Sequence, residues 1–286
     1  MKSTKKIIAI DKLHAFENHP YKVQDNEEME ALAESIKEHG IVSPVIVRPL
    51  ENTKDEYEII SGHRRVMASR KAGITEIPAL IVSLDRDAAA IVLVDSNLHR
   101  EHILPSEKAY AYKMKLDAMK HQGWRSDLTS NQLGGKLETA DLVGAETGDS
   151  KNQVRRYIRL TNLIPEILQY VDDGRISFTP AVELSYLNEQ EQQDLLEQIE
   201  QSDCTPSLSQ ACRFKKISQG EGLTPEVIAE IMEEEKANQR EMFKVPMERI
   251  REFIPNANAK QAEDFVLKAC EHYRKFLIRQ RNRDER

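Results

Sequence analysis

The sequence is poor in several features that define whole classes of protein. Its 286 residues include three cysteines and no CxxC pair, which argues against a disulfide framework or a zinc site and favours a reducing cytoplasm. The longest apolar run, residues 88–94, is far shorter than the roughly 18 residues that span a membrane. The first residues contain no apolar segment of signal-peptide length. We therefore expect a cytoplasmic protein that does not enter a membrane.

Positive charge and aromatic residues are also scarce. The 41 Lys and Arg residues are outnumbered by 48 Asp and Glu residues, which gives a formal charge of −7. Over the whole chain this balance argues against nucleic-acid binding, because phosphate backbones attract positively charged surfaces. An aromatic content of 6% favours helices with aliphatic cores. The length corresponds to about two domains.

The pattern of apolar residues divides the chain into three regions. Residues 1–104 alternate strand and helix patterns, which predicts an α+β domain. Residues 105–220 contain helix patterns only, and residues 221–286 form a small, mainly helical C-terminal region. The predicted strands lie near residues 6–10, 45–48, 57–60 and 77–82.

A candidate anion site follows the third predicted strand. Residues 57–65 place a glycine between that strand and a helix, with two arginines in the first helical turn. Cations there oppose the helix dipole, so the arrangement favours a bound phosphate chain. The alternative is that the arginines are solvated or pair with Glu56 or Glu58. The site residues are Ser61, Gly62, His63, Arg64 and Arg65.

A second polar cluster, residues 95–101, follows the apolar run and contains Asn97 and Arg100. By itself it is read as the polar end of a helix. His99 and His102 have a spacing that is seen in metal-binding pairs, but surface histidines are the simpler interpretation.

A helix-turn-helix is predicted next. Residues 139–146 form a short helix, Gly148 and Asp149 turn, and Ser150 caps a second helix. Residues 151–160 contain four basic residues and no acidic one, which is typical of a helix that enters the DNA major groove. The alternative is a solvated basic face, and Arg175 is as readily a plain turn residue. The predicted DNA contacts are Lys151, Asn152, Gln153, Arg155, Arg156, Arg159 and Arg175.

The two sites in this order resemble the ParB family of chromosome and plasmid partition proteins. The resemblance covers roughly residues 6–190, and its best-matched blocks are residues 32–48, 61–68, 96–101 and 139–160. It implies an N-terminal ParB/sulfiredoxin-like nucleotide-binding domain, then an all-α helix-turn-helix domain.

The resemblance also implies ligands and partners. Gly62, Arg64 and Arg65 would contact the phosphates of CTP, and Asn97 would bind Mg²⁺ with Arg100 as a support. The helix-turn-helix would bind a centromere-like palindrome in double-stranded DNA. CTP would then close a homodimer into a clamp that slides on DNA and works with a ParA-type ATPase. The apolar face of the last helix is either intramolecular core or the dimer contact.

The sequence departs from the family pattern at several positions. His63 stands where the family usually has Glu, and Ser96 replaces a Glu that is linked to hydrolysis, so we expect at most a weak CTP hydrolase. An Asn-Pro-Arg element appears as His19-Pro20-Tyr21, with Lys22 as a replacement cation. The usual Gly-His-Ala-Arg stretch appears as residues 179–182, Thr-Pro-Ala-Val. These departures suggest a divergent branch, carried on a plasmid or integrative element and associated with the nucleoid or the plasmid.

Two other functions fit parts of the sequence. A transcriptional regulator or nucleoid-associated protein would use the same helix-turn-helix without a nucleotide. An enzyme of the sulfiredoxin type would need a nucleophilic cysteine near Gly62, and no cysteine precedes Cys204.

Overall fold

The computed structural model describes residues 3–51, 53–98, 100, 102–122, 140, 143–144, 148–220, 222–234, 247–255 and 258–284. The chain forms two compact units, residues 1–234 and 235–286. Among the helices in these ranges, none has the length and apolar character of a membrane span.

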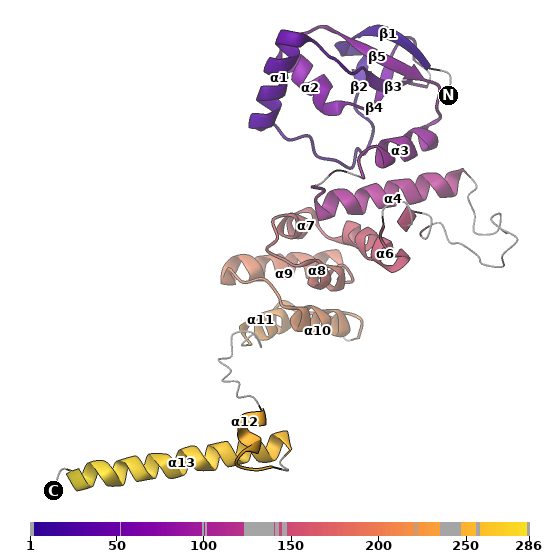
Figure 1. Ribbon diagram of the computed structural model, residues 1–286. Coiled ribbons are helices and arrows are strands. Elements are labelled where there is room, and N and C mark those ends of the chain that lie inside the picture. The colour runs from indigo at the N-terminus through magenta and orange to yellow at the C-terminus, as the bar shows by residue number, and fades with distance from the viewer. Residues whose placement is uncertain are drawn as a thin grey trace, which may run out of the picture. The chain divides into compact units, whose positions relative to one another are not determined.

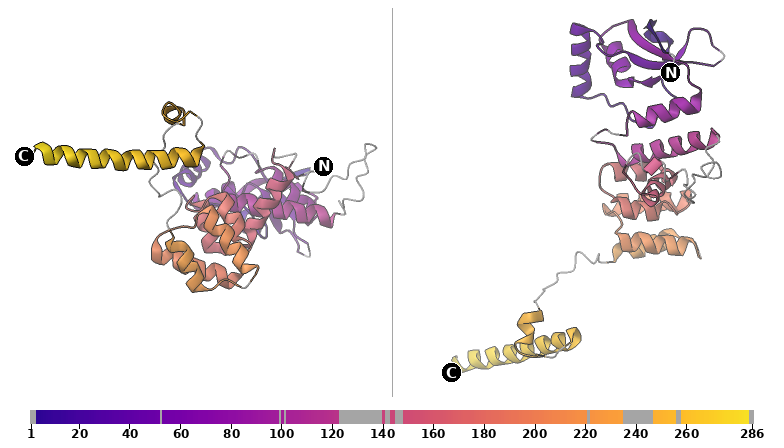
Figure 2. Two further views of the ribbon diagram at one scale, coloured as in Figure 1. Left: turned by 90° about the horizontal axis from the view of Figure 1, so that it is seen from below. Right: turned by 45° about the vertical axis from the view of Figure 1, so that its right-hand side comes forward.

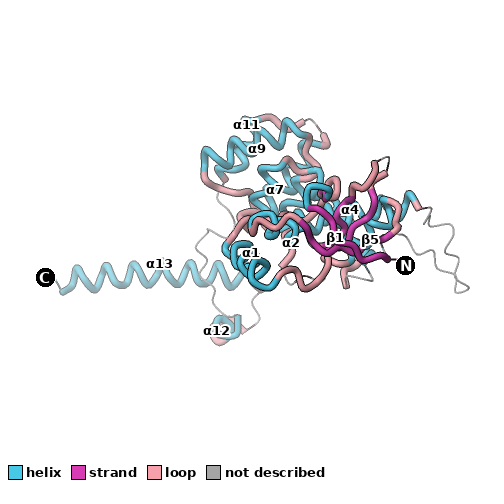
Figure 3. The backbone as a smooth tube through the Cα atoms, turned by 90° about the horizontal axis from the view of Figure 1, so that it is seen from above, coloured by secondary structure: helices cyan, strands magenta, loops and turns pink. Residues whose placement is uncertain are grey.

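The first unit begins with a mixed five-stranded sheet (Figure 1). The strands are β1 (Ser3–Ala9), β2 (Leu13–His14), β3 (Val45–Pro49), β4 (Tyr57–Ser61) and β5 (Glu76–Val82), in the order β1-β5-β3-β4-β2. β1 is antiparallel to β5, β3 is parallel to β5 and antiparallel to β4, and β2 is parallel to β4. All four predicted strands are confirmed. Figure 3 shows the strands in this one region and helices through the remaining described chain.

Helices α1 (Glu27–His39), α2 (His63–Lys71) and α3 (Arg86–Asp95) belong to the same domain. Asn26 caps α1 by accepting a hydrogen bond from the Met29 amide, and Gly40 ends it with a φ of 72°. The apolar run 88–94, whose periodicity does not distinguish helix from strand, forms α3. Asp85 caps its first turn, which favours a helix. The side chains of Leu93 and Val94 in this helix are fully buried.

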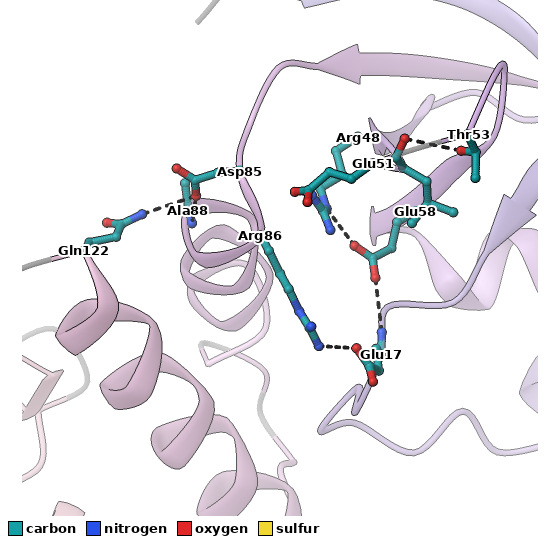
Figure 4. A network of polar contacts seen from close by, with 10 residues as sticks. Glu17, Arg48, Glu51, Thr53, Glu58, Asp85, Arg86, Ala88 and Gln122 are labelled. Atoms are coloured by element: carbon teal, nitrogen blue, oxygen red, sulfur yellow. Dashed lines mark hydrogen bonds and ion pairs between the residues drawn. The ribbon is translucent and has the colours of Figure 1, made fainter.

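A buried ion pair joins β3 and β4 of this domain (Figure 4). Arg48 Nε of β3 lies 2.6 Å from Glu58 Oε2 of β4, and both residues are only 4% exposed. Glu58 also accepts a hydrogen bond from the Glu17 amide, and Glu17 pairs with Arg86 of α3. Glu58 therefore joins the sheet to the loop before α1 and is not a partner of Arg64 or Arg65.

The helical region consists of α4 (Pro105–His121), α6 (Lys151–Arg159), α7 (Pro165–Asp172), α8 (Phe178–Leu184), α9 (Glu189–Ser202), α10 (Leu208–Ser218) and α11 (Pro225–Glu233). Short 3-10 turns follow β1 (Ile10–Lys12) and α6 (Leu160–Asn162). Figure 2 shows these helices following one another from α4, beside α3, to α10 and α11. Ile167, Leu184, Leu195 and Phe214 form the fully buried centre of this region. Ile228 and Ile231 of α11 join the same core, so the division between the units falls after Glu234.

The second unit contains α12 (Met247–Arg251) and α13 (Ala259–Asp284). An apolar groove between them is lined by Ile250, Phe253, Phe265 and Tyr273, among others. Along α13, Tyr273 and Phe276 are 61% and 52% exposed, so the described residues of this unit leave much of this face uncovered.

Candidate nucleotide and DNA sites

The glycine at the start of α2 is required by the backbone. Gly62 has a φ of 107°, and a Cβ there would lie 2.8 Å from Val45 Cγ1. As the N-cap residue, it offers no side chain to the first amides of α2. The predicted strand–glycine–helix arrangement is confirmed, and the first turn of α2 has N–H groups without a side-chain cap.

The two arginines of this turn hold partners within the protein. Arg64 Nη2 lies 3.0 Å from Glu28 Oε2 of α1, in an exposed ion pair. Arg65 Nη1 donates to the carbonyl oxygens of Ser43 and Pro44, at 2.9 Å for Pro44. Because an exposed ion pair contributes at most about 1 kcal/mol, Arg64 can exchange Glu28 for a phosphate at little cost.

His63 is half-buried and packs against a second histidine. Its ring centroid lies 3.9 Å from that of His19, and its Nε2 accepts a hydrogen bond from the Phe16 amide. Burial, with the neighbouring His19 and Arg100, lowers the pKa of His63 to about 3. Burial also lowers the pKa of His19, whose Nδ1 donates to the Tyr21 carbonyl oxygen. Both rings are therefore neutral at pH 7.

The loop that carries His19 and Tyr21 contacts both the first turn of α2 and the end of α3. Arg100 stacks over the Tyr21 ring at 5.4 Å, and the Tyr21 hydroxyl donates to the Val94 carbonyl oxygen. The structure thus places Arg100 near His63, and it adds His19 and Tyr21 to the same region. From the sequence, His19 and Tyr21 were interpreted only as a departure from the family motif. A histidine and a tyrosine on either side of Pro20 could have indicated that this loop belongs to the site.

Asn97 lies in the turn that ends α3. Its Nδ2 donates to Leu93 O at 2.7 Å and to Ser96 Oγ at 3.2 Å, so Oδ1 is the side-chain atom that could serve as a metal ligand. The neighbouring carboxylate, Asp95, pairs with the buried Lys115 of α4 at 2.5 Å and is already used. His99 lies outside the described residues. Among the residues that are described, no group of three His, Cys, Asp or Glu side chains forms a metal site.

Lys22 contacts the helical region in the structure. Its Nζ lies 3.1 Å from Asp172 Oδ2 and 3.2 Å from Gln169 Oε1, both on α7. In the structure the ammonium group of Lys22 is paired with α7, and its role as a replacement for the missing arginine stays a prediction.

The second helix of the predicted helix-turn-helix is α6. Gly148 turns with a φ of 76°, and Ser150 Oγ accepts a hydrogen bond from the Gln153 amide, so the turn and the cap are confirmed. Val154 is fully buried against α4. Of the predicted first helix, residues 139–146, only Ala140, Val143 and Gly144 belong to the described residues.

The arginines of α6 have two different surroundings. Asn152 and Arg155 are exposed, with Lys151 and Gln153 partly so. Arg156 donates to Thr179 Oγ1 at 3.0 Å and lies over the Phe178 ring. Arg159 donates to the Ser185 carbonyl oxygen at 2.9 Å and stacks on Tyr186 at 3.7 Å.

Arg175 lies outside α6, in the turn after α7. It pairs with Asp203 at 3.0 Å and stacks over Tyr170. Its role as a phosphate contact stays a prediction, and so do the roles of the other proposed contacts.

An α+β domain with this glycine–arginine turn, followed by a helix-turn-helix, defines a two-domain class of protein. The family model for the ParB N-terminal domain matches residues 1–98, and the model for the ParB HTH domain matches residues 101–210. The chain therefore belongs to the ParB family.

Two curated relatives illustrate the range of the family. A nucleoid occlusion protein of Listeria innocua is 32% identical over 196 residues, which cover 68% of this chain and 62% of that protein. A probable chromosome 1-partitioning protein ParB of Deinococcus radiodurans is 37% identical over 163 residues, 57% of this chain and 49% of that protein. The chain thus spans about half to three fifths of the length of these relatives.

Solved structures resemble the chain loosely. The C-terminally truncated ParB of Caulobacter crescentus, complexed to the centromeric parS site, aligns with a TM-score of 0.42 and 20% identity, covering 79% of this chain and 98% of that chain. A pNOB8-like ParB N-domain aligns with a TM-score of 0.44 and 17% identity over 81% of this chain and 96% of that chain.

Proposed function

We propose that this protein is a DNA-binding partition protein that reads a centromere-like palindrome with α6 and uses CTP to close on DNA as a sliding clamp. One observation carries the proposal: the Gly62 turn, His19, Tyr21 and Arg100 converge at the start of α2, in a chain whose next domain presents a basic helix. The two matched family models support both halves.

The residues at the start of α2 suit a triphosphate. The uncapped amides of the first turn and the Arg64 guanidinium would bind phosphate oxygens, and Glu28 would be displaced. Magnesium, when bound, would offset charge on the phosphates, held by Asn97 Oδ1, water and the phosphates themselves. Ser96 Oγ donates to Leu93 O and carries no carboxylate, so we propose at most weak hydrolysis.

Calorimetry with CTP and Mg²⁺ tests the nucleotide site. Arg64→Ala should weaken binding about tenfold or more, because it removes a charge-assisted phosphate contact. Lys71→Ala is the matched control, since Lys71 is a cation in the last turn of the same helix and pairs with Asp25. If CTP does not bind, or if Arg64→Ala binds like the control, the assignment of the nucleotide site is wrong.

Salt titrations test the DNA site. On duplex DNA, the slope of log affinity against log salt should fall by about 0.9 for each lost phosphate contact. Arg155→Ala should lower it, whereas Lys120→Ala on α4, which removes an exposed lysine paired with Asp117, should not. An unchanged slope and affinity for Arg155→Ala would show that α6 does not face DNA.

A nucleotide-independent regulator is the second candidate. It is favoured because polar side chains of the site already have hydrogen-bond partners within the protein. Arg65 donates to backbone carbonyl oxygens, and His63 accepts a hydrogen bond from the Phe16 amide. Site-specific crosslinking with and without CTP separates the candidates, because only a nucleotide-gated clamp changes its crosslinks when CTP is added.

A homodimer and a ParA-type ATPase are the proposed partners, in the cytoplasm at a nucleoid or plasmid. Palindromic sites are bound by two-fold dimers, and the exposed face of α13 is the proposed contact. Phe276→Asp should shift the full chain to monomer in sedimentation, whereas Lys268→Asp, at an exposed position outside this face, should not. A Phe276→Asp protein that stays dimeric would place the contact elsewhere. We also propose that the protein belongs to a divergent branch of the family that is carried on a plasmid or integrative element.

A further inference from the structure

The turn before α6 is held by α4 through Asp149. The Tyr112 hydroxyl donates to Asp149 Oδ2 at 2.5 Å, and Lys108 Nζ lies 2.7 Å from the same oxygen. Tyr112 is fully buried, and both donors come from one face of α4, one helical turn apart. A single carboxylate thus receives two donors from α4.

The backbone of the same turn is held from a second direction. A Cβ on Gly144 would overlap the carbonyl oxygen of Asp149, so only glycine lets the two segments pack this closely. Ser150, which caps α6, follows Asp149 directly. The position of the first turn of α6 is therefore set at Asp149, by its side chain and by its backbone.

Aromatic packing extends this support along α6. Lys108 lies over the rings of Tyr112 and Tyr157, and the Tyr157 ring contacts Phe178 at 4.6 Å. Asn152 and Arg155 stand on the exposed side, opposite the buried Val154. A shift at Asp149 would therefore redirect these two side chains, while the basic charge of α6 would stay the same.

The charge of Asp149 is neutralised at the same place. Burial alone would raise the pKa of Asp149, but the hydrogen bonds from Lys108 and Tyr112 lower it below its ordinary value. An uncompensated carboxylate beside a DNA-facing helix would repel phosphates, and Lys108 cancels that repulsion.

We propose that Asp149 is a positioning residue for the recognition of DNA sequence. Lys108 and Tyr112 bind its carboxylate, Gly144 packs against its backbone, and together these contacts set the direction of α6. The proposal rests on the proposed DNA site. It assigns to Asp149 a role in sequence specificity, because base contacts need accurate placement, whereas phosphate attraction needs only charge.

The test uses the full chain and two probes. A pool of short duplexes with a randomised centre is enriched on the wild-type protein, and the selected duplex and a scrambled version are then titrated. For Asp149→Ala, the ratio of the two affinities should fall about tenfold, since poorly placed side chains lose base discrimination. Loss of folded protein lowers both affinities equally and leaves this ratio unchanged, so the ratio separates positioning from stability.

Further variants keep the test decisive. Asp117→Asn, which removes an exposed carboxylate from α4, is the matched control and should keep the ratio. Lys108→Met should lower it, and combination with Asp149→Ala should add little, because both remove one interaction. If Asp149→Ala does not fold, Lys108→Met alone decides. A wild-type ratio, within twofold, in the folded variants would overturn the proposal, whereas a wild-type protein that enriches no duplex would instead refute the DNA site.

Discussion

The site at the start of α2 and the basic face of α6 both present arginines, but the two regions hold them differently. We use the name cradle for the first of these regions, which consists of Gly62, His63, Arg64 and Arg65 with the neighbouring His19 and Tyr21. In the cradle, Arg64 has an exposed partner on α1, and the nearby histidines carry no charge. On α6, Arg156 and Arg159 are anchored by hydrogen bonds and aromatic rings of α8 and the following turn. The exchangeable partner of Arg64 suits a site that a small anion enters and leaves, although Arg65 of the same turn is held by the carbonyl oxygens of Ser43 and Pro44. The anchored Arg156 and Arg159 keep a surface in one shape for a large ligand.

The largest expected effect concerns the backbone of the cradle. Gly62→Ala should destabilise the protein by about 2 kcal/mol and abolish CTP binding, because the residue needs a positive φ and lies against Val45. Urea unfolding and calorimetry measure the two effects. Gly73→Ala is the control, since Gly73 has a φ of 73° but open space around it, and should cost less and keep CTP binding.

Acid should destabilise the cradle next most strongly. His63 titrates near 3 in the folded protein and near 6.5 when unfolded, so the unfolded state takes up protons first and stability falls as the pH drops below 6.5. The loss should be about 1 kcal/mol per pH unit between 6 and 5. Urea titrations should show a flatter profile for His63→Gln. His121→Gln, at an exposed histidine, should keep the wild-type profile.

Replacing one arginine in each region should lower the free energy of unfolding by unequal amounts. Arg159→Met should cost about 1 kcal/mol of unfolding free energy, because its hydrogen bonds to Ser185 and its contact with Tyr186 are partly buried. Arg64→Met should cost less than about 0.5 kcal/mol. Equal losses in urea unfolding would show that the two regions do not differ as described.

The smallest effect concerns the partner of Arg64. Glu28→Gln should tighten CTP binding by about two- to fivefold, because phosphate no longer competes with a carboxylate for the guanidinium group. The effect should shrink at high salt. Glu38→Gln, at the other end of α1, serves as the control in calorimetry; a tightening of equal size there would indicate a general charge effect.

Much of this arrangement could be predicted from local sequence. The Gly62 turn, the Ser150 cap and the strands of the sheet depend on neighbouring residues, whose conformational preferences act over a few positions. The partners of Arg64, Lys22 and Asp149 could not be predicted, because they lie on other helices. The formal charge of −7 was a poor guide for the same reason: it averages residues 151–160 with acidic faces elsewhere.

By itself, the sequence determined the order of the two domains, the strand–glycine–helix turn at Gly62 and the basic helix at 151–159. Only the tertiary structure decided which arginines are anchored, that His19 and Tyr21 belong to the cradle, and that α4 supports the turn before α6. The physical reason is that turns and caps are local, whereas the packing around His63 and Tyr112 joins segments far apart in the chain.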